Sequence, residues 1–375
     1  MDSLGLYLHI PFCAAICNYC NFNRGLYDEA LKLRYVDALI QEIRRTGPER
    51  ERADTIFFGG GTPSLLEPAD VSSLIQNCRN TFVMPDDAEI TLEANPETVT
   101  RETLDAFRAA GVNRLSFGVQ SFRDEELQRL SRLHDASRAR VACQWARQAG
   151  FENVSLDLMM WLPGQVLSEW MESVEALIDV SPDHASLYLL ELYPHAPLRE
   201  QMSRTGLTLA PDDEAAEMYL AAMARLDSAG YAQYEISNVA RPGRRARHNL
   251  KYWTDGEWLG FGCGAHSTRR GVRWKNVSVT DEYVRRVAEG ASVVSDRRVL
   301  PPPAQLEEAL FTGLRLSAGV DLDAVAARYG VDVWQRYGSA LEPHLEAGLL
   351  QKEGSRLRLT RQGMLLSQEV LAVFV

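Results

Sequence analysis

The sequence predicts an α/β protein whose first two thirds form a parallel sheet that closes, fully or in part, into a barrel. Three observations predict this fold. Strand-like apolar segments alternate with amphipathic segments, the alternation repeats six times, and an unusual polar, glycine or cysteine feature follows nearly every strand. β-α units in series imply a parallel sheet, because each helix returns the chain to the edge where the next strand starts.

The six strands are rich in β-branched and aromatic residues, which favour an extended backbone in a sheet. We expect them at 6–10, 54–58, 88–94, 112–119, 153–160 and 184–192. Amphipathic stretches separate them, and we expect helices near 29–46, 68–82, 100–110, 137–149, 167–180 and 212–229.

The residues that follow the strands distinguish a barrel from an open sheet. They are the cysteines within 13–20, "GGGTPS" at 59–64, Glu93 with Asn95, Gln120 with Ser121, Asp157, and Glu191 with Tyr193. In a barrel, the carboxyl ends of all strands meet at one mouth, where active sites are built. In an open sheet, they spread along an edge and gather at a switch point. Polar features after so many strands therefore favour the barrel.

The last part of the chain predicts a separate module. Three prolines in "RVLPPPAQ" (298–305) indicate a linker, and the segments after it predict three helices, a short hairpin and a further helix. That order resembles a winged-helix-like α+β module, and the absence of a dense basic helix favours packing or partner binding over DNA binding. We expect three segments: a barrel over 1–235, a segment of extra strands packed on the barrel over 236–298, and the module over 299–375.

Charge and composition exclude several classes of protein. The 375-residue chain has a net charge of −11, which argues against nucleic acid as its main partner. It has no run of about 18 apolar residues that would span a membrane. Its start, "MDSLGLYLHIPFC", lacks a basic region followed by a long apolar stretch, so we expect no secretory signal and a cytoplasmic protein. In a reducing compartment, clustered cysteines more often bind metal or do chemistry than form disulfides.

Three cysteines carry the strongest functional signal. Cys13, Cys17 and Cys20 follow the first strand with the spacing C-x3-C-x2-C, whereas Cys78 and Cys143 lie in helical segments and are expected to be buried. A redox pair would leave one of the three unexplained, and a structural zinc site needs four ligands. An iron–sulfur cluster fits best, because thiolates in a short loop are its usual ligands. Three thiolates on a four-iron cluster leave one iron open.

The cysteine spacing, followed by "GGGTP" after the second strand, resembles the radical S-adenosylmethionine (SAM) superfamily. The resemblance implies a partial (β/α)6 TIM-like barrel and a [4Fe–4S] cluster whose open iron binds SAM. Gly60 and Gly61 suit such a site, because glycine lets the backbone approach a ligand closely and offer its N–H groups. Glu93 and Asp157 could accept hydrogen bonds from ribose hydroxyls or an ammonium group, or they could cap helices instead.

Longer motifs narrow the resemblance. "LYLHIPFC", "FFGGGTPSLL", "LEANPE", "LSFGVQSF" and "DLMMWLPGQ" resemble the family of oxygen-independent coproporphyrinogen III oxidase and its paralogue, the HemW-type heme chaperone, over roughly residues 5–375. By this resemblance the positions that contact SAM are Tyr7, Gly60, Thr62, Glu93, Gln120, Arg132 and Asp157. We add Tyr19 and Gly61 to the expected cofactor-binding residues.

Two departures separate the branches of this family. By this resemblance, the oxidase carries the pattern C-x3-C-x2-C-x-C, with a cysteine where this chain has Phe22. The oxidase also carries an N-terminal extension, whereas Tyr7 lies almost at the start of this chain. HemW-like proteins instead carry H-N-x-x-Y-W, a motif that the resemblance links to heme binding. In this chain the motif consists of His248, Asn249, Tyr252 and Trp253, with two residues between the second and third.

The chemistry of residues 241–253 suits heme. Neutral imidazole is a good iron ligand, so His248 is a candidate, with His266 and Cys263 as alternatives nearby in sequence. Tyr252 and Trp253 offer flat apolar faces to a macrocycle. Four arginines could pair with its propionates, because guanidinium meets carboxylate in a bidentate fork: Arg241, Arg244, Arg245 and Arg247. The same residues could also form a solvated basic loop with a core histidine.

Together these features predict a heme chaperone that carries a SAM-binding [4Fe–4S] cluster and passes heme to acceptor proteins, including membrane-bound respiratory enzymes. Peripheral contact with a membrane and a homodimer are both compatible with that role. The main alternative is the oxidase, which converts coproporphyrinogen III to protoporphyrinogen IX by radical-driven decarboxylation. A radical SAM enzyme that acts on heme itself and a zinc-containing interaction protein are the remaining alternatives, and whether the chain is an enzyme stays open.

Overall fold

One twelve-stranded sheet dominates the computed structural model, which describes residues 3–46 and 51–375. Six neighbouring strands in its middle run parallel and in chain order. They are β1 (Leu4–Ile10), β4 (Ala53–Gly60), β5 (Glu89–Ala94), β6 (Arg114–Gln120), β7 (Val154–Met160) and β8 (His184–Leu189). Each overlaps the segment that the alternation predicts, so the predicted order of six strands is confirmed.

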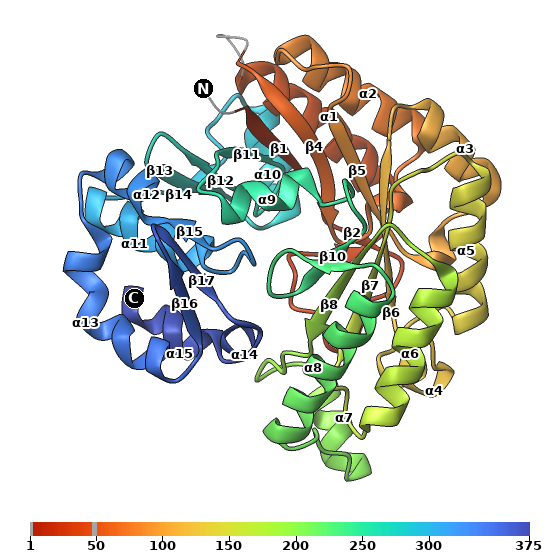
Figure 1. Cartoon of the computed structure of the whole chain (residues 1–375). Helices are drawn as coiled ribbons and strands as arrows, with labels where there is room; N and C mark the ends of the chain where they lie inside the picture. The colour runs from red at the N-terminus through yellow and green to blue at the C-terminus, as the bar shows by residue number, and fades with distance from the viewer. Residues whose placement is uncertain (1–2, 47–50) are drawn as a thin grey trace.

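Helices on the outer side of this curved sheet join the strands (Figure 1). The six expected helices are all present: α1 (Glu29–Thr46), α2 (Pro68–Thr81), α3 (Arg101–Ala109), α5 (Ala136–Gln148), α6 (Leu167–Val180) and α8 (Asp212–Ser228). Cys78 and Cys143 are buried in α2 and α5, as expected. Two shorter helices, α4 (Asp124–Arg129) and α7 (Pro197–Thr205), lie in connections where the sequence analysis expects no helix.

Alternation along the strands separates an apolar outer face from a polar interior, because successive side chains point to opposite faces. Residues such as Leu6, Phe58, Leu92, Phe117 and Leu156 pack with the helices in the main hydrophobic core. The residues of opposite parity form the interior, among them Thr55, Glu89, Arg114, Ser155 and His184, which are all buried. A polar interior in a parallel sheet leaves room for ligands that need charges and hydrogen bonds.

The barrel does not close. On one side β1 pairs in parallel with β11 (Trp258–Phe261), and on the other β8 pairs antiparallel with β10 (Asn238–Ala240), which in turn pairs with β9 (Ala232–Gln233). Beyond β11, the sheet continues antiparallel through β12 (His266–Arg269), β13 (Val272–Asn276) and β14 (Val294–Val299), with α10 (Thr280–Ala288) between the last two. This open sheet confirms the predicted partial barrel.

The C-terminal part has a core of its own, which includes Leu310, Leu341 and Leu357. It contains α11 (Pro302–Gly313), α12 (Leu322–Tyr329), α13 (Val333–Glu346), the hairpin β16 (Leu350–Glu353) and β17 (Arg356–Leu359), then α14 (Arg361–Leu365), α15 (Ser367–Leu371) and a final turn at Ala372–Phe374. The short strand β15 (Val320–Asp321) pairs with β17. This part lies beside β11–β14 (Figure 1), and the predicted division into three segments stays a prediction.

The expected linker at 298–305 is shorter than its prolines suggest. Strand β14 ends at Val299 and α11 begins at Pro302, so Leu300 and Pro301 alone separate them. Proline suits the first turn of a helix, because its fixed φ is helical and its missing N–H would have no partner there. The prolines therefore begin a helix here. In the part of the chain that the structure describes, no helix is long and apolar enough to cross a membrane.

Candidate functional site

The three clustered cysteines lie at the mouth of the barrel. Their loop leaves β2 (Phe12–Cys13) and returns through β3 (Gly25–Leu26), and the two short strands pair in parallel at its base. Cys13, Cys17 and Cys20 line a cavity of about 360 Å³, which we call the inner cavity. The same cavity is lined by Tyr19, Gly60, Gly61, Thr62, Glu93, Gln120, Arg132 and Asp157. The structure thus brings these predicted residues together from separate strands.

The glycines of "GGGTPS" are required by backbone shape and by close approach. Gly60 has φ +118°, a conformation that side-chain-bearing residues rarely adopt. A Cβ added to Gly61 would lie 2.7 Å from the Phe12 carbonyl oxygen and 3.0 Å from the Cys13 sulfur. The loop therefore sits directly against the first cysteine, so a larger residue at position 61 would displace a thiol of the cluster.

Arg132 joins the cysteine loop to the barrel. Its guanidinium lies 3.4 Å from the Cys17 sulfur, and it donates to the Asn95 side chain at 2.7 Å and to the Gly118 carbonyl at 2.6 Å. Arg132 can therefore position and neutralise negative charge at this end of the cavity.

Two half-buried carboxyl groups also line the inner cavity. Glu93 accepts a hydrogen bond from the Gly60 N–H at 3.2 Å, and Asp157 accepts one from the Ser116 hydroxyl at 3.3 Å. Burial raises the pKa of Glu93 to about 8, with Asp157 as a further cause, and burial raises the pKa of Asp157 to about 6. Such carboxyls in a cavity are typical of ligand sites, and the interior position excludes the alternative that they cap helices.

Asn18 anchors the cysteine loop and was not predicted. Its side-chain amide donates to the Arg129 carbonyl and to the Gln201 side chain, both at 2.8 Å, and its backbone carbonyl accepts from the Leu198 N–H. The loop is thereby tied to the end of α4 and to α7. Tyr19 packs beside it on a small apolar cluster that includes Leu130, Met159, Leu162, Leu190 and Leu198. No sequence motif marks Asn18, because its partners are distant in the chain.

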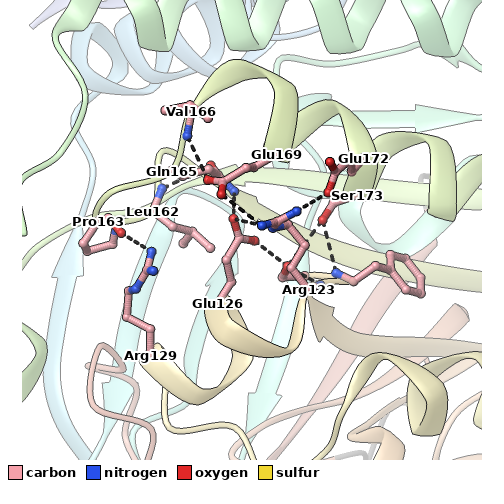
Figure 2. A network of polar contacts seen from close by, with 12 residues as sticks. Arg123, Glu126, Arg129, Leu162, Pro163, Gln165, Val166, Glu169, Glu172 and Ser173 are labelled. Carbon is pink, nitrogen blue, oxygen red and sulfur yellow. Dashed lines mark hydrogen bonds and ion pairs between the residues drawn. The ribbon is translucent and has the colours of Figure 1, made fainter.

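A network of charged residues fixes α4 in turn (Figure 2). Arg123 donates to Glu169 at 2.9 Å and also pairs with Glu172. The buried Glu126 accepts from the Gln165 amide at 2.9 Å and from the Ser121 hydroxyl, and Arg129 donates to the Pro163 carbonyl. The network holds α4 against α6 and the turn before it. It thereby fixes the helix end that receives Asn18 and leads to Arg132.

Replacing Glu126 with alanine is therefore expected to lower the free energy of unfolding by about 1–3 kcal/mol, because it leaves buried donors of Ser121 and Gln165 without their acceptor. Denaturant unfolding measures the change. The matched control is Glu125→Ala, one position away and exposed, with an expected change near zero. Equal changes in the two variants would show that the network does not stabilise α4.

The donor set of the inner cavity fits an iron–sulfur cluster. Within the described residues, no three His, Cys, Asp or Glu side chains converge closely enough to hold a single metal ion. Thiolates on different irons of a cluster lie farther apart than ligands of one ion. Three free cysteines that line one cavity, with Gly61 in contact with the first of them, are the arrangement that a cluster needs.

The histidine of the H-N-x-x-Y-W motif is a core residue. Helix α9 (Arg247–Trp253) enters the barrel at the amino ends of the strands, where the Glu89 carboxylate accepts the backbone N–H groups of Arg247 and His248, each at 2.9 Å. The His248 ring is fully buried, hydrogen-bonded to the Thr55 hydroxyl at 2.8 Å and stacked 5.1 Å from Phe57. Burial lowers the pKa of His248 to about 3, so its ring is neutral.

The other motif residues point in different directions. Tyr252 donates to or accepts from the second His248 ring nitrogen at 2.9 Å, and Asn249 is half-buried on the same helix. Trp253 faces the C-terminal part, where the Arg315 guanidinium lies 4.5 Å from its ring centre. The four arginines before the motif contact other groups, such as the Ser181 hydroxyl and Asp54, and none lines the inner cavity. Cys263 is buried beside Tyr35 and Asn23.

A second cavity, of about 720 Å³, opens beside the first, and we call it the outer cavity. Tyr7 lines it, with its hydroxyl 3.1 Å from a ring nitrogen of His9. Tyr252, Trp258, His266 and Lys275 also line it. The two cavities share Asn21, Phe22, Gly60 and Glu93, so they are contiguous.

Comparison with known proteins agrees with this architecture. A profile described as the radical SAM superfamily matches residues 7–177, and one described as the HemN C-terminal domain matches residues 300–366. The superfamily match implies a [4Fe–4S] cluster and SAM for this chain. Among solved structures, the coproporphyrinogen III oxidase HemN of Escherichia coli, a radical SAM enzyme, aligns with a TM-score of 0.88 and 25% identity, covering 99% of this chain and 90% of that one.

Curated relatives give the closer assignment. The heme chaperone HemW of Bacillus subtilis (strain 168) is 38% identical over 372 residues, which is 98% of each chain. The heme chaperone HemW of Mycobacterium tuberculosis (strain H37Rv) is 36% identical over 376 residues, or 98% of this chain and 93% of the relative. With such identity over nearly the full length of both chains, this chain belongs to the HemW family within the radical SAM superfamily.

Proposed function

We propose that this protein is a heme chaperone that binds heme next to a SAM-binding [4Fe–4S] cluster and delivers it to acceptor proteins, membrane-bound respiratory enzymes among them. The observation that carries the proposal is the full-length likeness to relatives named heme chaperone HemW. A cavity with aromatic, imidazole and ammonium side chains beside the cysteine site supports it. The cytoplasm is the proposed location, and contact with a membrane surface or a second copy is compatible with delivery.

In this proposal Cys13, Cys17 and Cys20 ligate the cluster, and the iron without a cysteine binds SAM. When bound, SAM and the cluster supply radical chemistry or, in a chaperone, a signal that controls heme release. The Gly60 and Gly61 backbone offers close approach, and the carboxyls of Glu93 and Asp157 accept hydrogen bonds from the ligand. The remaining proposed SAM contacts are Tyr7, Tyr19, Thr62, Gln120 and Arg132, which line the two contiguous cavities.

The proposal is tested by anaerobic reconstitution of the cluster, followed by titration with hemin and recording of the Soret band. We expect saturable binding, with transfer of the bound heme to an apo-cytochrome added afterwards. Linear, non-saturable uptake by the cluster-loaded protein would contradict the proposal. A parallel assay for 5′-deoxyadenosine decides whether SAM is cleaved in the presence of heme.

The oxidase is the second candidate, and the full-length likeness to the HemN structure favours it. It predicts that coproporphyrinogen III, SAM and a reductant give protoporphyrinogen IX. Phe22 weighs against it, because the resemblance places a cysteine there in the oxidase. The Phe22 ring is 65% exposed and lines both cavities, so it offers an apolar surface where a cysteine would offer a thiol. We expect no decarboxylated product from this protein.

A further inference from the structure

The heme-binding residues can be sought in the outer cavity, whose volume of about 720 Å³ lies within the range of about 300–1,000 Å³ usual for ligand sites. A metalloporphyrin needs flat apolar faces, a Lewis base for its iron and cations for its two propionates. The outer cavity offers all three, with the Tyr252 and Trp258 rings, the His266 imidazole and the Lys275 ammonium, whereas the inner cavity contains no histidine.

His248 cannot ligate iron from where it lies. One ring nitrogen is 2.8 Å from the Thr55 hydroxyl and the other is 2.9 Å from the Tyr252 hydroxyl, so both are already hydrogen-bonded. The ring is fully buried and packs against Phe57 and Tyr7 at the amino ends of the strands. Gly5 closes the same space, because a Cβ there would lie 3.1 Å from the ring. A ligand role would require α9 to leave the barrel.

His266 meets the requirement instead. It is the first residue of β12, its side chain is exposed to the outer cavity, and neither ring nitrogen makes a hydrogen bond with any described residue. Its backbone is held in place, because the Trp258 indole N–H donates to the His266 carbonyl at 3.0 Å. Partial burial and the neighbouring cations Lys275, Arg273 and Arg298 lower the pKa of His266, which favours the neutral ring that binds iron.

The motif reaches His266 through a chain of contacts. His248 bonds the Tyr252 hydroxyl, and the Tyr252 ring packs edge-on against Trp258 with ring centres 4.7 Å apart. Trp258 then fixes the backbone of His266. His248 therefore affects the position of His266 only indirectly, through Tyr252 and Trp258. Loss of heme from a His248 variant would not identify His248 as the iron ligand.

The strands around His266 provide the cations. In the register of β12, β13 and β14, His266 lies opposite Lys275, and Thr268 lies opposite Arg273, which lies opposite Arg298. Residues opposite one another share a face of the sheet, so these cations and His266 are on the same side. Lys275 makes no ion pair within the described residues, although Asp296 is its neighbour in register on β14. Arg298 is exposed, whereas Arg273 already pairs with Glu308 at 2.6 Å.

We propose that heme occupies the outer cavity with His266 as its axial iron ligand, its macrocycle against Tyr252, Trp258 and Phe22, and a propionate on Lys275. His248 is then a positioning residue. This inference rests on the proposed heme-chaperone function and adds the ligand and the orientation. Phe22 and Asn21 belong to both cavities, so heme in this position lies against the cysteine loop.

The test compares heme spectra of cluster-loaded variants under anaerobic conditions, by difference absorption and by electron paramagnetic resonance. We expect His266→Ala to weaken heme binding about tenfold or more and to remove the histidine-ligated spectrum, since the iron loses its nitrogen ligand. Added imidazole should restore that spectrum. Lys275→Ala should weaken binding and leave the spectrum unchanged, and so should Tyr252→Phe. The matched control is His195→Ala, an exposed histidine that lines neither cavity, which should behave as wild type.

The outcomes separate the two proposals. If the wild type binds heme saturably and His266→Ala keeps the same spectrum, His266 is not the ligand, while the chaperone function stands. The assignment is also overturned if His248→Ala folds normally but loses the histidine-ligated spectrum while His266→Ala retains it. If the wild type itself does not bind heme saturably, the proposed function fails and the assignment fails with it.

Discussion

Replacing Cys17 with serine is expected to abolish the cluster. A serine hydroxyl is a poor substitute for a thiolate on iron, and the two remaining cysteines cannot hold a four-iron cluster that needs three ligands. Cys17 is half-buried, and its sulfur contacts the Arg132 guanidinium at 3.4 Å. A hydroxyl can keep that contact, so the variant should still fold. Anaerobic reconstitution followed by iron and sulfide analysis should give no more than background iron and a colourless protein.

The control for this experiment is Cys143→Ala. Cys143 is buried in the middle of α5 and has no role in the cysteine loop, and alanine is favourable in a helix. It should assemble as much cluster as the wild type. A Cys17→Ser protein that has a wild-type circular dichroism spectrum and a full complement of iron and sulfide would refute the assignment of the ligands. SAM binding, followed by calorimetry, should disappear together with the cluster.

The arrangement of the central strands could be predicted because its signals are local. Each strand shows its apolar outer residues within a few positions, and each helix shows its own amphipathic repeat. The predicted helices at 29–46 and 167–180 have the ends that the structure gives them. The polar interior residues, such as Glu93 and Asp157, follow from the same alternation, which places them on the face opposite Leu92 and Leu156.

The two edges of the barrel could not be predicted in the same way. Leu6 of β1 is paired with Leu259 of β11, and nothing near either residue indicates a partner so far along the chain. Strand β10 has three residues, too few to show an alternation. These pairings decide that the barrel stays open, and the outer cavity exists because β11–β13 extend the sheet beside β1.

The candidate site also has local parts that the sequence predicts and long-range contacts that it does not. The spacing of Cys13, Cys17 and Cys20 is a local pattern, and so is the glycine run. The contact between Arg132 and Cys17 joins residues 115 positions apart and depends on the fold of the loop after α4. The motif histidine shows the limit most clearly, because the sequence identifies an imidazole at position 248 but not the direction in which it points. Packing against Phe57 and Thr55 decides that it is a core residue.

Replacing His248 with alanine is expected to lower the free energy of unfolding by about 2–4 kcal/mol at pH 7. The change empties a fully buried site and removes the partner of the buried Thr55 hydroxyl and of the half-buried Tyr252 hydroxyl. Denaturant unfolding measures the effect. The control His195→Ala removes an exposed imidazole and should cost little.

The free energy of unfolding of the wild type and of His248→Ala should also depend differently on pH, and this difference identifies a buried neutral His248 ring in the wild type. Burial holds the folded pKa of His248 at about 3, below the ordinary value of 6.5. Between these two values the unfolded chain binds a proton that the folded chain does not, so the stability that the neutral ring contributes is present above 6.5 and is lost as the pH falls toward 3. From pH 7 to pH 5 this loss amounts to about 2 kcal/mol for one such histidine.

The wild type should therefore lose about 2 kcal/mol more than His248→Ala between pH 7 and pH 5, since the variant no longer has the titrating group. Burial also lowers the pKa of His9 and His184, but both residues are present in the two proteins, so their contributions cancel in the difference. If the difference in free energy of unfolding between the wild type and His248→Ala is the same at pH 7 and pH 5, His248 is already protonated or exposed in the folded protein. An exposed His248 would again be available to iron, and the distinction between a positioning His248 and a ligating His266 would fail.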